Sequence, residues 1–335
     1  MKLYLIRHGE TVDNVAGLYA GVRDSALTNH GVDQARRLGE YFAKDGVKLT
    51  HIFASPLSRA SKTAEAVRTA QPQPASDGDN AQTKSLKFVR VPQLIEQDFG
   101  YYEGKPFYTR SDPKKTGRES HLEKHKSDPG FVDVESKESM AKRADAFLDQ
   151  HLMPLFDEEP AGTAAAAMVS HGILLSNLWR RLLLRLPRKS LTIAPEITAS
   201  NGTLVLEHLG GWSNTGYLEL FMSKDSAVSE PASAPVPSLQ AASEEVASLP
   251  TPIPLPGDRE GAAVSLAAGP PGGSKPSEPA KAGPRVLHGW STTILAIDSK
   301  QHLVSLKRQR GGIGRLAHDE GQKKLDVFFK RQKTS

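Results

Sequence analysis

The sequence contains no cysteine among its 335 residues. That absence excludes disulfide frameworks, thiolate zinc sites and cysteine nucleophiles. No apolar run approaches the roughly 18 residues that a membrane-spanning helix needs. Residues 1–8 hold only a short apolar run before Arg7 and His8, which is too short for the apolar core of a secretory signal. We therefore expect an intracellular protein that does not span a membrane.

Aromatic residues are missing from one long window, residues 223–284. This window of 62 residues holds 12 of the chain's 23 prolines and no Phe, Trp or Tyr. Such a composition buries too little apolar area to offset the entropy lost on ordering the chain. The composition predicts a disordered insert rich in Pro, Ala and Ser.

Acidic residues are scarce near the C-terminus. Residues 281–335 contain 12 Lys and Arg against 4 Asp and Glu, a net charge of +8, whereas the whole chain carries only +5. The rest of the chain is therefore mildly acidic, with a net charge of −3. A basic tail of this kind suits a nuclear address, nucleic acid or an acidic partner.

Short apolar runs alternate with amphipathic stretches before the insert. The predicted strands are 3–6, 49–54, 164–169 and 217–222, and the predicted helices are 28–46, 55–70, 140–156 and 173–186. In the helix of 55–70, Ser55 is expected to be the N-cap and Pro56 the first helical residue. Alternating strands and helices imply an α/β fold: a three-layer sandwich whose mostly parallel sheet carries helices on both faces.

Structure is expected to resume after the insert, because residues 293–297 are again strand-like. We interpret 285–306 as a segment that returns to the sheet of the 1–222 catalytic domain, and 307–335 as a basic tail. The alternative is a free tail with a hairpin of its own, which would be marginally stable.

Two histidines and two arginines follow predicted strands at the same kind of position. Arg7 and His8 come directly after the first strand, Arg59 lies in the first turn of the helix after the second, and His171 follows the strand 164–169. The carboxyl ends of parallel strands form the crevice in which ligands bind. Nearby helix N-termini add partial positive charge, so the predicted pocket suits a phosphoryl group.

These motifs resemble, in type and order, the histidine phosphatase superfamily, the phosphoglycerate-mutase-like proteins whose signature contains Arg-His-Gly. The matching runs are Leu-Ile-Arg-His-Gly-Glu-Thr at 5–11, Ser-Pro-Leu-Ser-Arg-Ala at 55–60, Leu-Ile-Glu at 94–96, Val-Ser-His-Gly at 169–172, Asn-Thr-Gly at 214–216 and the segment 298–303. The resemblance covers residues 1–222 and about 286–306, and it implies the fold of that family.

The resemblance implies roles for four residues of the pocket. His8 would be the nucleophile that forms a phosphohistidine, which requires a neutral imidazole. Arg7 and Arg59 would disfavour protonation of His8 and hold the phosphate, and His171, followed by Gly172, would donate to the transferring oxygens. No metal or other cofactor is implied.

Two further residues have roles with open alternatives. Glu96 would protonate the leaving oxygen and then activate water, although Asp98 and Glu103 lie close in sequence. Asn14 matches a position that contacts phosphate in relatives, or it caps a local turn. The Lys-rich stretch 105–135 is either a lid over an anionic substrate or a solvated face.

Three functions remain open from the sequence. Mutases of the superfamily carry Glu-Arg-His-Tyr-Gly at the acid segment, whereas residues 96–100 read Glu-Gln-Asp-Phe-Gly. This difference favours a phosphatase acting on a phosphorylated small molecule or phosphoprotein. The alternatives are a phosphoglycerate-mutase-type phosphotransferase and a non-catalytic adaptor.

The tail contains a second motif. The motif resembles the PCNA-interacting box and consists of Gln322, Leu325, Phe328 and Phe329. In a 3₁₀ turn, residues three apart lie on the same face, so their apolar side chains would form one compact binding surface. The resemblance implies binding to the PCNA sliding clamp, and the flanking basic runs favour a nuclear location in addition to a cytoplasmic one. The alternative is a C-terminal helix that folds back onto the catalytic domain. No direct nucleic-acid site is identified.

Overall fold

The computed structural model describes residues 1–72, 85–107, 122–158, 164–187, 189–201, 204–224, 284–310 and 312–319. In this part of the chain one seven-stranded sheet has the order β3-β2-β4-β1-β6-β7-β5. The strands are β1 (Lys2–Arg7), β2 (His51–Ala54), β3 (Lys87–Arg90), β4 (Ala165–Ser170), β5 (Leu191–Ile193), β6 (Tyr217–Lys224) and β7 (Trp290–Ser299).

The sheet is mixed but mostly parallel. β3, β2, β4 and β1 run parallel to one another, β6 is antiparallel to both β1 and β7, and β5 is parallel to β7. The α/β class and the mostly parallel sheet predicted from the sequence are confirmed. Because β1, β4 and β2 are adjacent and parallel, the loops after them emerge side by side.

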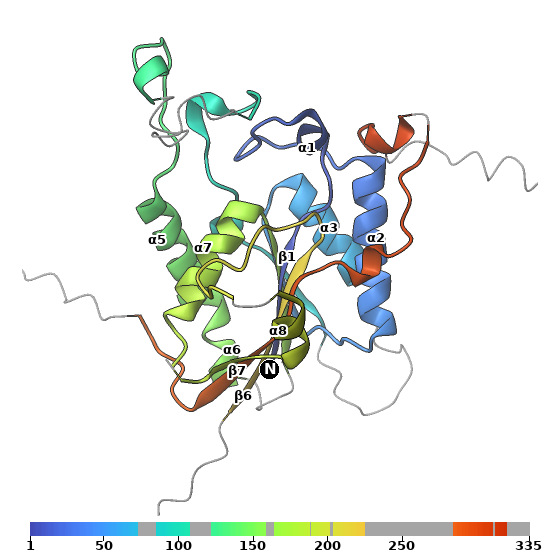
Figure 1. The fold of residues 1–335 in the computed structure, drawn as a ribbon, viewed down its shortest axis with the longest axis vertical. Coiled ribbons are helices and arrows are strands. Elements are labelled where there is room, and N and C mark those ends of the chain that lie inside the picture. Colours follow the sequence, from blue (N-terminus) through green and yellow to red (C-terminus); the bar gives the residue numbers. More distant parts are fainter. Residues whose placement is uncertain are drawn as a thin grey trace, which may run out of the picture. The chain divides into compact units, whose positions relative to one another are not determined.

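Helices cover both faces of the sheet (Figure 1), with α5 and α7 on one side and α2 and α3 on the other. The described α-helices are α1 (Val12–Ala16), α2 (Asn29–Lys44), α3 (Ser58–Thr69), α5 (Lys137–Phe147), α6 (Leu155–Glu158), α7 (Gly172–Leu183) and α8 (Pro195–Asn201). The 3₁₀ turns are η1 (Pro92–Leu94), η2 (Gly100–Tyr102), η4 (Gln301–Leu303) and η5 (Ile313–Arg315), and η3 (Leu148–Leu152) is a π-helical turn. No helix in the described ranges is long and apolar enough to cross a membrane.

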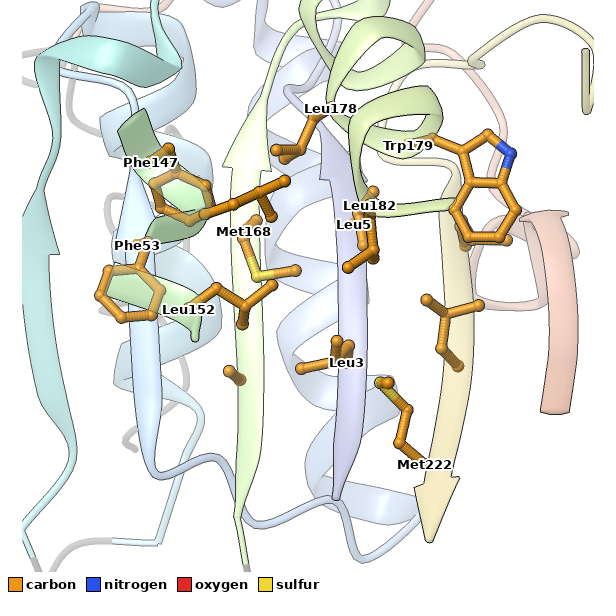
Figure 2. Packing of buried hydrophobic residues seen from close by; sticks show 14 of the residues in the cluster. Leu3, Leu5, Phe53, Phe147, Leu152, Met168, Leu178, Trp179, Leu182 and Met222 are labelled. Atoms are coloured by element: carbon orange, nitrogen blue, oxygen red, sulfur yellow. The ribbon is translucent and has the colours of Figure 1, made fainter. Parts of the chain in front are cut away.

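Strand β1 is buried on both faces of the sheet, which explains its continuous apolar sequence. Leu3 and Leu5 pack into the cluster beneath α5 and α7, which Figure 2 shows with Phe147 and Trp179. The alternate residues, Tyr4 and Ile6, pack on the other face with the residues of α2 and α3. Successive side chains of a strand point to opposite faces, so a strand covered on both sides needs apolar residues throughout.

Two predicted helices differ from the observed ones. The helix expected over 140–156 is divided into α5, the π turn η3 and α6, and Pro154, which has no N–H to donate, lies between η3 and α6. The helix α3 begins at Ser58 with Leu57 as N-cap, not at Ser55. Ser55 is therefore free to bond elsewhere, in the site described below.

The chain returns to the sheet after residue 284. Lys224, at the end of β6, pairs with Trp290, at the start of β7, so the chain leaves and re-enters at neighbouring positions. Residues 225–283 of the predicted insert (223–284) and the predicted PCNA box at 322–329 lie outside the described residues, whereas Ser223 and Lys224 belong to β6. The domain boundaries proposed from the sequence remain predictions.

The segment after β7 runs along α2. The Arg37 guanidinium donates to the Val304 carbonyl at 3.0 Å, and the Asn29 backbone N–H donates to the Leu316 carbonyl at 3.0 Å. Figure 1 shows this segment in red beside α2. Residues 307–310 and 312–319, which the sequence assigns to the basic tail, thus lie against the same unit.

Candidate active site

His8 is positioned by the strand that precedes it. Its backbone N–H donates to the Ser170 carbonyl at the end of β4, at 3.0 Å, which continues the parallel ladder by one residue. The ring is almost fully buried and lies 5.0 Å from the ring of His171. Adjacent parallel strands therefore bring together two histidines that are far apart in sequence.

The hydrogen bonds of His8 define its tautomer. Nδ1 lies 2.7 Å from the Gly9 carbonyl oxygen, which can only accept, so we assign the proton to Nδ1. Burial, followed by the charges of Arg59 and Arg7, lowers the pKa of His8 well below its ordinary value. The imidazole is thus neutral, and Nε2 keeps the lone pair that a nucleophile needs.

A strained turn supports the backbone under His8. Thr215 has φ of 56°, and its N–H donates to the carbonyls of Arg7 at 3.1 Å and of His8 at 3.2 Å. The Asn214 amide donates to the same His8 carbonyl, and the Thr215 hydroxyl bonds the buried His302 ring. A left-handed conformation is costly for a β-branched residue, and its cost is offset here by these bonds.

Arg7 presents a free donor to the site. One terminal nitrogen donates to the Trp212 carbonyl, whereas the buried Nε has no hydrogen-bond partner among the residues that the structure describes. A Cβ added at Gly172 would lie 3.8 Å from this Nε. An unpaired buried N–H is costly, so the arrangement favours an anionic ligand that would accept from it.

Arg59 is buried and held by the loop of residues 20–23. Its terminal nitrogens donate to the carbonyls of Ala20, Gly21 and Arg23. Glu103 holds the same loop from its other side, because its carboxylate accepts from the backbone N–H groups of residues 21–23. Glu103 is thus engaged in shaping the loop, and it is absent from the residues that line the cavity.

His171 links the two sides of the site. Its Nδ1 accepts from Arg59 Nε at 3.2 Å, and its Nε2 lies 2.8 Å from the Ser55 hydroxyl. Both ring nitrogens are therefore occupied. For His171 to donate to a phosphate, its proton must move to Nδ1, which the Ser55 hydroxyl permits by donating to Nε2 instead.

Glu96 lies at the N-terminus of α7. Its carboxylate accepts from the backbone N–H groups of Ile173, at 3.1 Å, and Leu174, at 2.9 Å. Burial raises the pKa of Glu96, although these hydrogen bonds, that of Gln97 and the charge of Arg59 oppose the shift. A buried carboxyl with a raised pKa is suited to exchange protons.

Asn14 is the third residue of α1 and takes part in the cap at the N-terminus of this helix. Its Oδ1 accepts from the Thr11 N–H at 3.2 Å, while the Thr11 hydroxyl accepts from the Asn14 N–H, which is a capping box. Asn214 also donates to this Oδ1. These bonds turn the oxygen toward the protein, and the amide nitrogen is the end that remains for a ligand.

These groups surround a cavity of about 520 Å³. Arg7, His8, Asn14, Arg59, Glu96 and Gly172 line it, whereas His171 lies behind Arg59 and is fully buried. Within the described ranges no group of three or more His, Asp or Glu side chains is placed to hold a metal ion. The cavity therefore combines a neutral histidine, the guanidinium groups of Arg7, Arg59 and Arg180, and a buried carboxyl.

Sequence reasoning missed three residues that shape the site. Ser55 was interpreted only as a cap, and Trp212 and Arg143 were not singled out. Arg143 donates to the carbonyls of Gln93, Ile95 and Glu96, which fixes the segment that carries the carboxyl. Arg143 could have been noticed as an arginine within a predicted amphipathic helix. The carbonyl groups that it binds, however, lie about 50 residues away and cannot be deduced from sequence spacing.

The chain matches the family model of the histidine phosphatase superfamily (branch 1) over residues 3–208, and it belongs to this family. The protein named "Probable phosphoglycerate mutase GpmB" from Proteus mirabilis (strain HI4320) is 32% identical over 183 residues, or 55% of this chain and 75% of that protein. The protein of the same name from Yersinia pestis (strain Pestoides F) is 30% identical over 183 residues, with the same shares.

The chain is also similar to solved structures of two proteins. A mycobacterial glucosyl-3-phosphoglycerate phosphatase has 22% identity and a TM-score of 0.45, and the match covers 66% of this chain and 91% of that chain. A phosphoglycerate mutase from Bacillus anthracis has 21% identity and a TM-score of 0.44, with 66% and 87% covered. Family membership makes this chain a histidine phosphatase superfamily enzyme, either a phosphatase or a phosphoglycerate mutase.

Proposed function

We propose that this protein is a phosphatase that hydrolyses a phosphomonoester through a phosphohistidine on His8. The observation that carries the proposal is the pairing of a neutral, buried His8 with the unpartnered Nε of Arg7. Together they supply a nucleophile and an anion donor on adjacent residues. Arg59 adds a second guanidinium, which stabilises charge that develops on the phosphoryl oxygens.

In the first step, His8 Nε2 attacks phosphorus and the bond from phosphorus to the leaving oxygen breaks. Glu96 in its protonated form gives its proton to that oxygen, so an alcohol departs. Arg7 and Arg59 hold the phosphoryl oxygens throughout. Before substrate binds, His171 orients Arg59, because its Nδ1 accepts from the Arg59 Nε. Donation from His171 to the phosphoryl group would require that bond to break and the proton to move to Nδ1.

In the second step, water replaces the alcohol. The Glu96 carboxylate takes a proton from water as its oxygen attacks phosphorus, and the bond between phosphorus and Nε2 breaks. Orthophosphate leaves, and both His8 and Glu96 return to their starting protonation states. The cycle needs no group beyond the side chains named.

A phosphoglycerate mutase is the second candidate, and the names of the two relatives from Proteus and Yersinia favour it. A mutase must hold its substrate's second anionic group while the phosphoryl group moves between hydroxyls. Beyond Arg7 and Arg59, Arg180 is the one cationic Lys or Arg side chain among the described cavity residues. The missing Arg and Tyr of the mutase signature at residues 97–99 further support hydrolysis.

Labelling on histidine tests the proposal. Purified protein incubated with a hydrolysable phosphate donor should acquire an acid-labile label that is absent in His8→Ala. His288→Ala is the matched control, because His288 is exposed and lies outside the cavity. A label that survives in His8→Ala would overturn the assignment of the nucleophile.

For the tail, we propose from its sequence that residues 322–329 recruit the enzyme to PCNA. Gln322, Leu325, Phe328 and Phe329 fill every position of the box. A peptide of residues 318–335 should bind PCNA at tens of micromolar or better, and the double change Phe328→Ala with Phe329→Ala should abolish binding. Absence of binding by the wild-type peptide would exclude the recruitment.

A further inference from the structure

The cavity above His8 has two chemically different parts. The groups proposed to act on a phosphoryl group are charged or polar, and Arg180 and Ser176 add polar groups to the lining, whereas six large side chains of the lining are apolar or aromatic. The apolar lining consists of Leu18, Tyr19, Phe99, Phe107, Ile173 and Trp212. A phosphomonoester bound to Arg7 and Arg59 would place its leaving group against these side chains.

Three of the aromatic rings form one cluster from separate segments. The Tyr19 ring lies 4.7 Å from that of Phe99 and 4.9 Å from that of Phe107. Backbone bonds fix the cluster, because Tyr19 N–H donates to the Lys105 carbonyl at 2.9 Å and Phe107 N–H donates to the Gly17 carbonyl at 2.8 Å. The backbone that carries two of the three rings is therefore held by the protein's own hydrogen bonds.

Trp212 joins this wall to the phosphate donors. Its carbonyl accepts from Arg7, and its indole N–H donates to the Ser176 hydroxyl at 3.0 Å. The carbonyl and the indole N–H of Trp212 are thus engaged with the protein, so its ring offers a ligand an apolar surface. The same residue fixes the position of the phosphate and one side of the leaving group.

Part of the apolar surface of the wall is exposed to water, so a ligand that covers it would gain binding free energy. Phe107 is 53% exposed and Ile173 is 39% exposed, although both line the cavity. An apolar leaving group would remove this surface from water. A polyol would instead lose hydrogen bonds to water and find few partners along this wall.

We infer that the wall is a leaving-group subsite for aromatic or planar apolar alcohols, so that the preferred substrates are their phosphomonoesters. The catalytic consequence rests on the proposed phosphatase function, but the binding preference does not. Ring contacts of this kind favour offset or edge-to-face packing of a planar group. The structure thus assigns specificity to Tyr19, Phe99, Phe107 and Trp212.

Binding of two phosphonates to the full chain, measured by calorimetry, tests the subsite without requiring turnover. 2-Phenylethylphosphonate should bind at least about tenfold more tightly than ethylphosphonate, because only the former places a ring on the wall. Phe107→Ala should remove most of this preference. Phe221→Ala should retain it, since Phe221 is an exposed ring on β6 outside the cavity.

Hydrolysis of the matching esters separates this inference from the proposed function. 2-Phenylethyl phosphate should exceed ethyl phosphate in kcat/KM by a similar factor, and both alcohols are comparably poor leaving groups. Equal affinity for the two phosphonates overturns the subsite, whether or not the protein hydrolyses phosphates. Preferential binding of the aromatic phosphonate without hydrolysis of either ester supports the subsite and overturns the phosphatase.

Discussion

Glu96 shows how opposing forces on one residue set its chemistry. Two backbone N–H groups at the start of α7 favour its carboxylate, and burial favours its neutral form. Burial dominates, so the pKa of Glu96 lies above its ordinary value. A group of this kind can be protonated when substrate binds and ionised when water must be activated.

Replacing Glu96 should affect substrates according to their leaving groups. Glu96→Gln should lower kcat for 2-phenylethyl phosphate by about 10²- to 10⁴-fold, because an alkoxide must be protonated as it leaves. The phosphorylation step with 4-nitrophenyl phosphate should change little, since nitrophenolate leaves without a proton. Rapid-mixing measurement of nitrophenolate release checks this step separately from hydrolysis of the phosphoenzyme.

The pH dependence of the wild-type enzyme follows from two residues. Activity should fall at high pH as Glu96 loses the proton that it must donate, and at low pH as His8 gains a proton and loses its nucleophilic lone pair. In Glu96→Gln the high-pH fall should disappear. A fall that persists in this variant would assign the proton donor to another group.

At the scale of elements, local sequence patterns were sufficient to predict most of the central strands and helices. The apolar runs at 3–6 and 164–169 and the helices that follow them predict parallel strands, and β1 and β4 are indeed parallel neighbours. The edge strands β3 and β5 were not predicted, because they are short and their residues are mostly exposed or half-buried. Edge strands lack the apolar pattern that burial on both faces imposes.

The candidate site could be predicted only where a residue directly follows a strand. His8 and His171 satisfy this condition, and the adjacency of β1 and β4 brings their rings together. The bond between Ser55 and His171 could not be predicted, because it requires β2 to lie beside β4 with Ala54 opposite Val169. Strand order is a property of the folded sheet, and no local spacing encodes it.

Helix α5 supports the acid segment through Arg143. The guanidinium pairs with the Glu135 carboxylate at 2.7 Å and also donates to the carbonyls of Gln93, Ile95 and Glu96. Arg143 is thus a positioning residue, which acts on the reaction only through Glu96. Its planar fork satisfies several acceptors at once, which a lysine cannot reproduce.

Arg143→Lys should therefore lower kcat by about tenfold to a hundredfold and leave KM within about twofold, because the proton donor is displaced. The high-pH limb of the rate profile should move to lower pH, since a less firmly buried Glu96 has a lower pKa. Lys142→Gln, the exposed neighbour on α5, is the control and should match the wild type. Loss of activity with an unmoved pH limb would indicate a purely structural role.

At the scale of the whole molecule, an ion pair joins the catalytic loop to a segment about 300 residues away. The Arg308 guanidinium donates to both carboxylate oxygens of Glu10, which also accepts from the Thr28 hydroxyl at 2.8 Å. Glu10 lies two residues after His8. Gly31 permits this close packing, because a Cβ there would lie 2.1 Å from the Glu10 carbonyl oxygen.

This pair uses one member of the basic run at 307–310 that the sequence associates with nuclear import. Arg308 is half-buried against Glu10, whereas Lys307 and Arg310 are exposed. The segment that precedes the proposed PCNA box is therefore anchored two residues from His8, the proposed nucleophile. Any partner that draws the tail away would have to break this pair.

Loss of the pair should destabilise the protein in a pH-dependent way. Burial alone would raise the pKa of Glu10, but the hydrogen bonds from Arg308 and Thr28 outweigh burial and lower it. The stabilisation is therefore complete above the unfolded pKa of about 4.3 and disappears as pH falls through the lower folded value. Arg308→Ala should reduce the free energy of unfolding by about 1–3 kcal/mol at pH 7, because Glu10 loses its main donor.

Urea unfolding of the full chain at pH 7 and at successively lower pH values down to 3 measures this difference. Arg310→Ala, two residues further along the same exposed run, controls for the loss of one positive charge and should leave the unfolding midpoint near that of the wild type. The gap between wild type and Arg308→Ala should close as Glu10 is protonated in both proteins, because a neutral carboxyl no longer attracts the guanidinium. A gap that stays constant across this range would show that Arg308 stabilises the fold by packing, and that its charge on Glu10 contributes nothing.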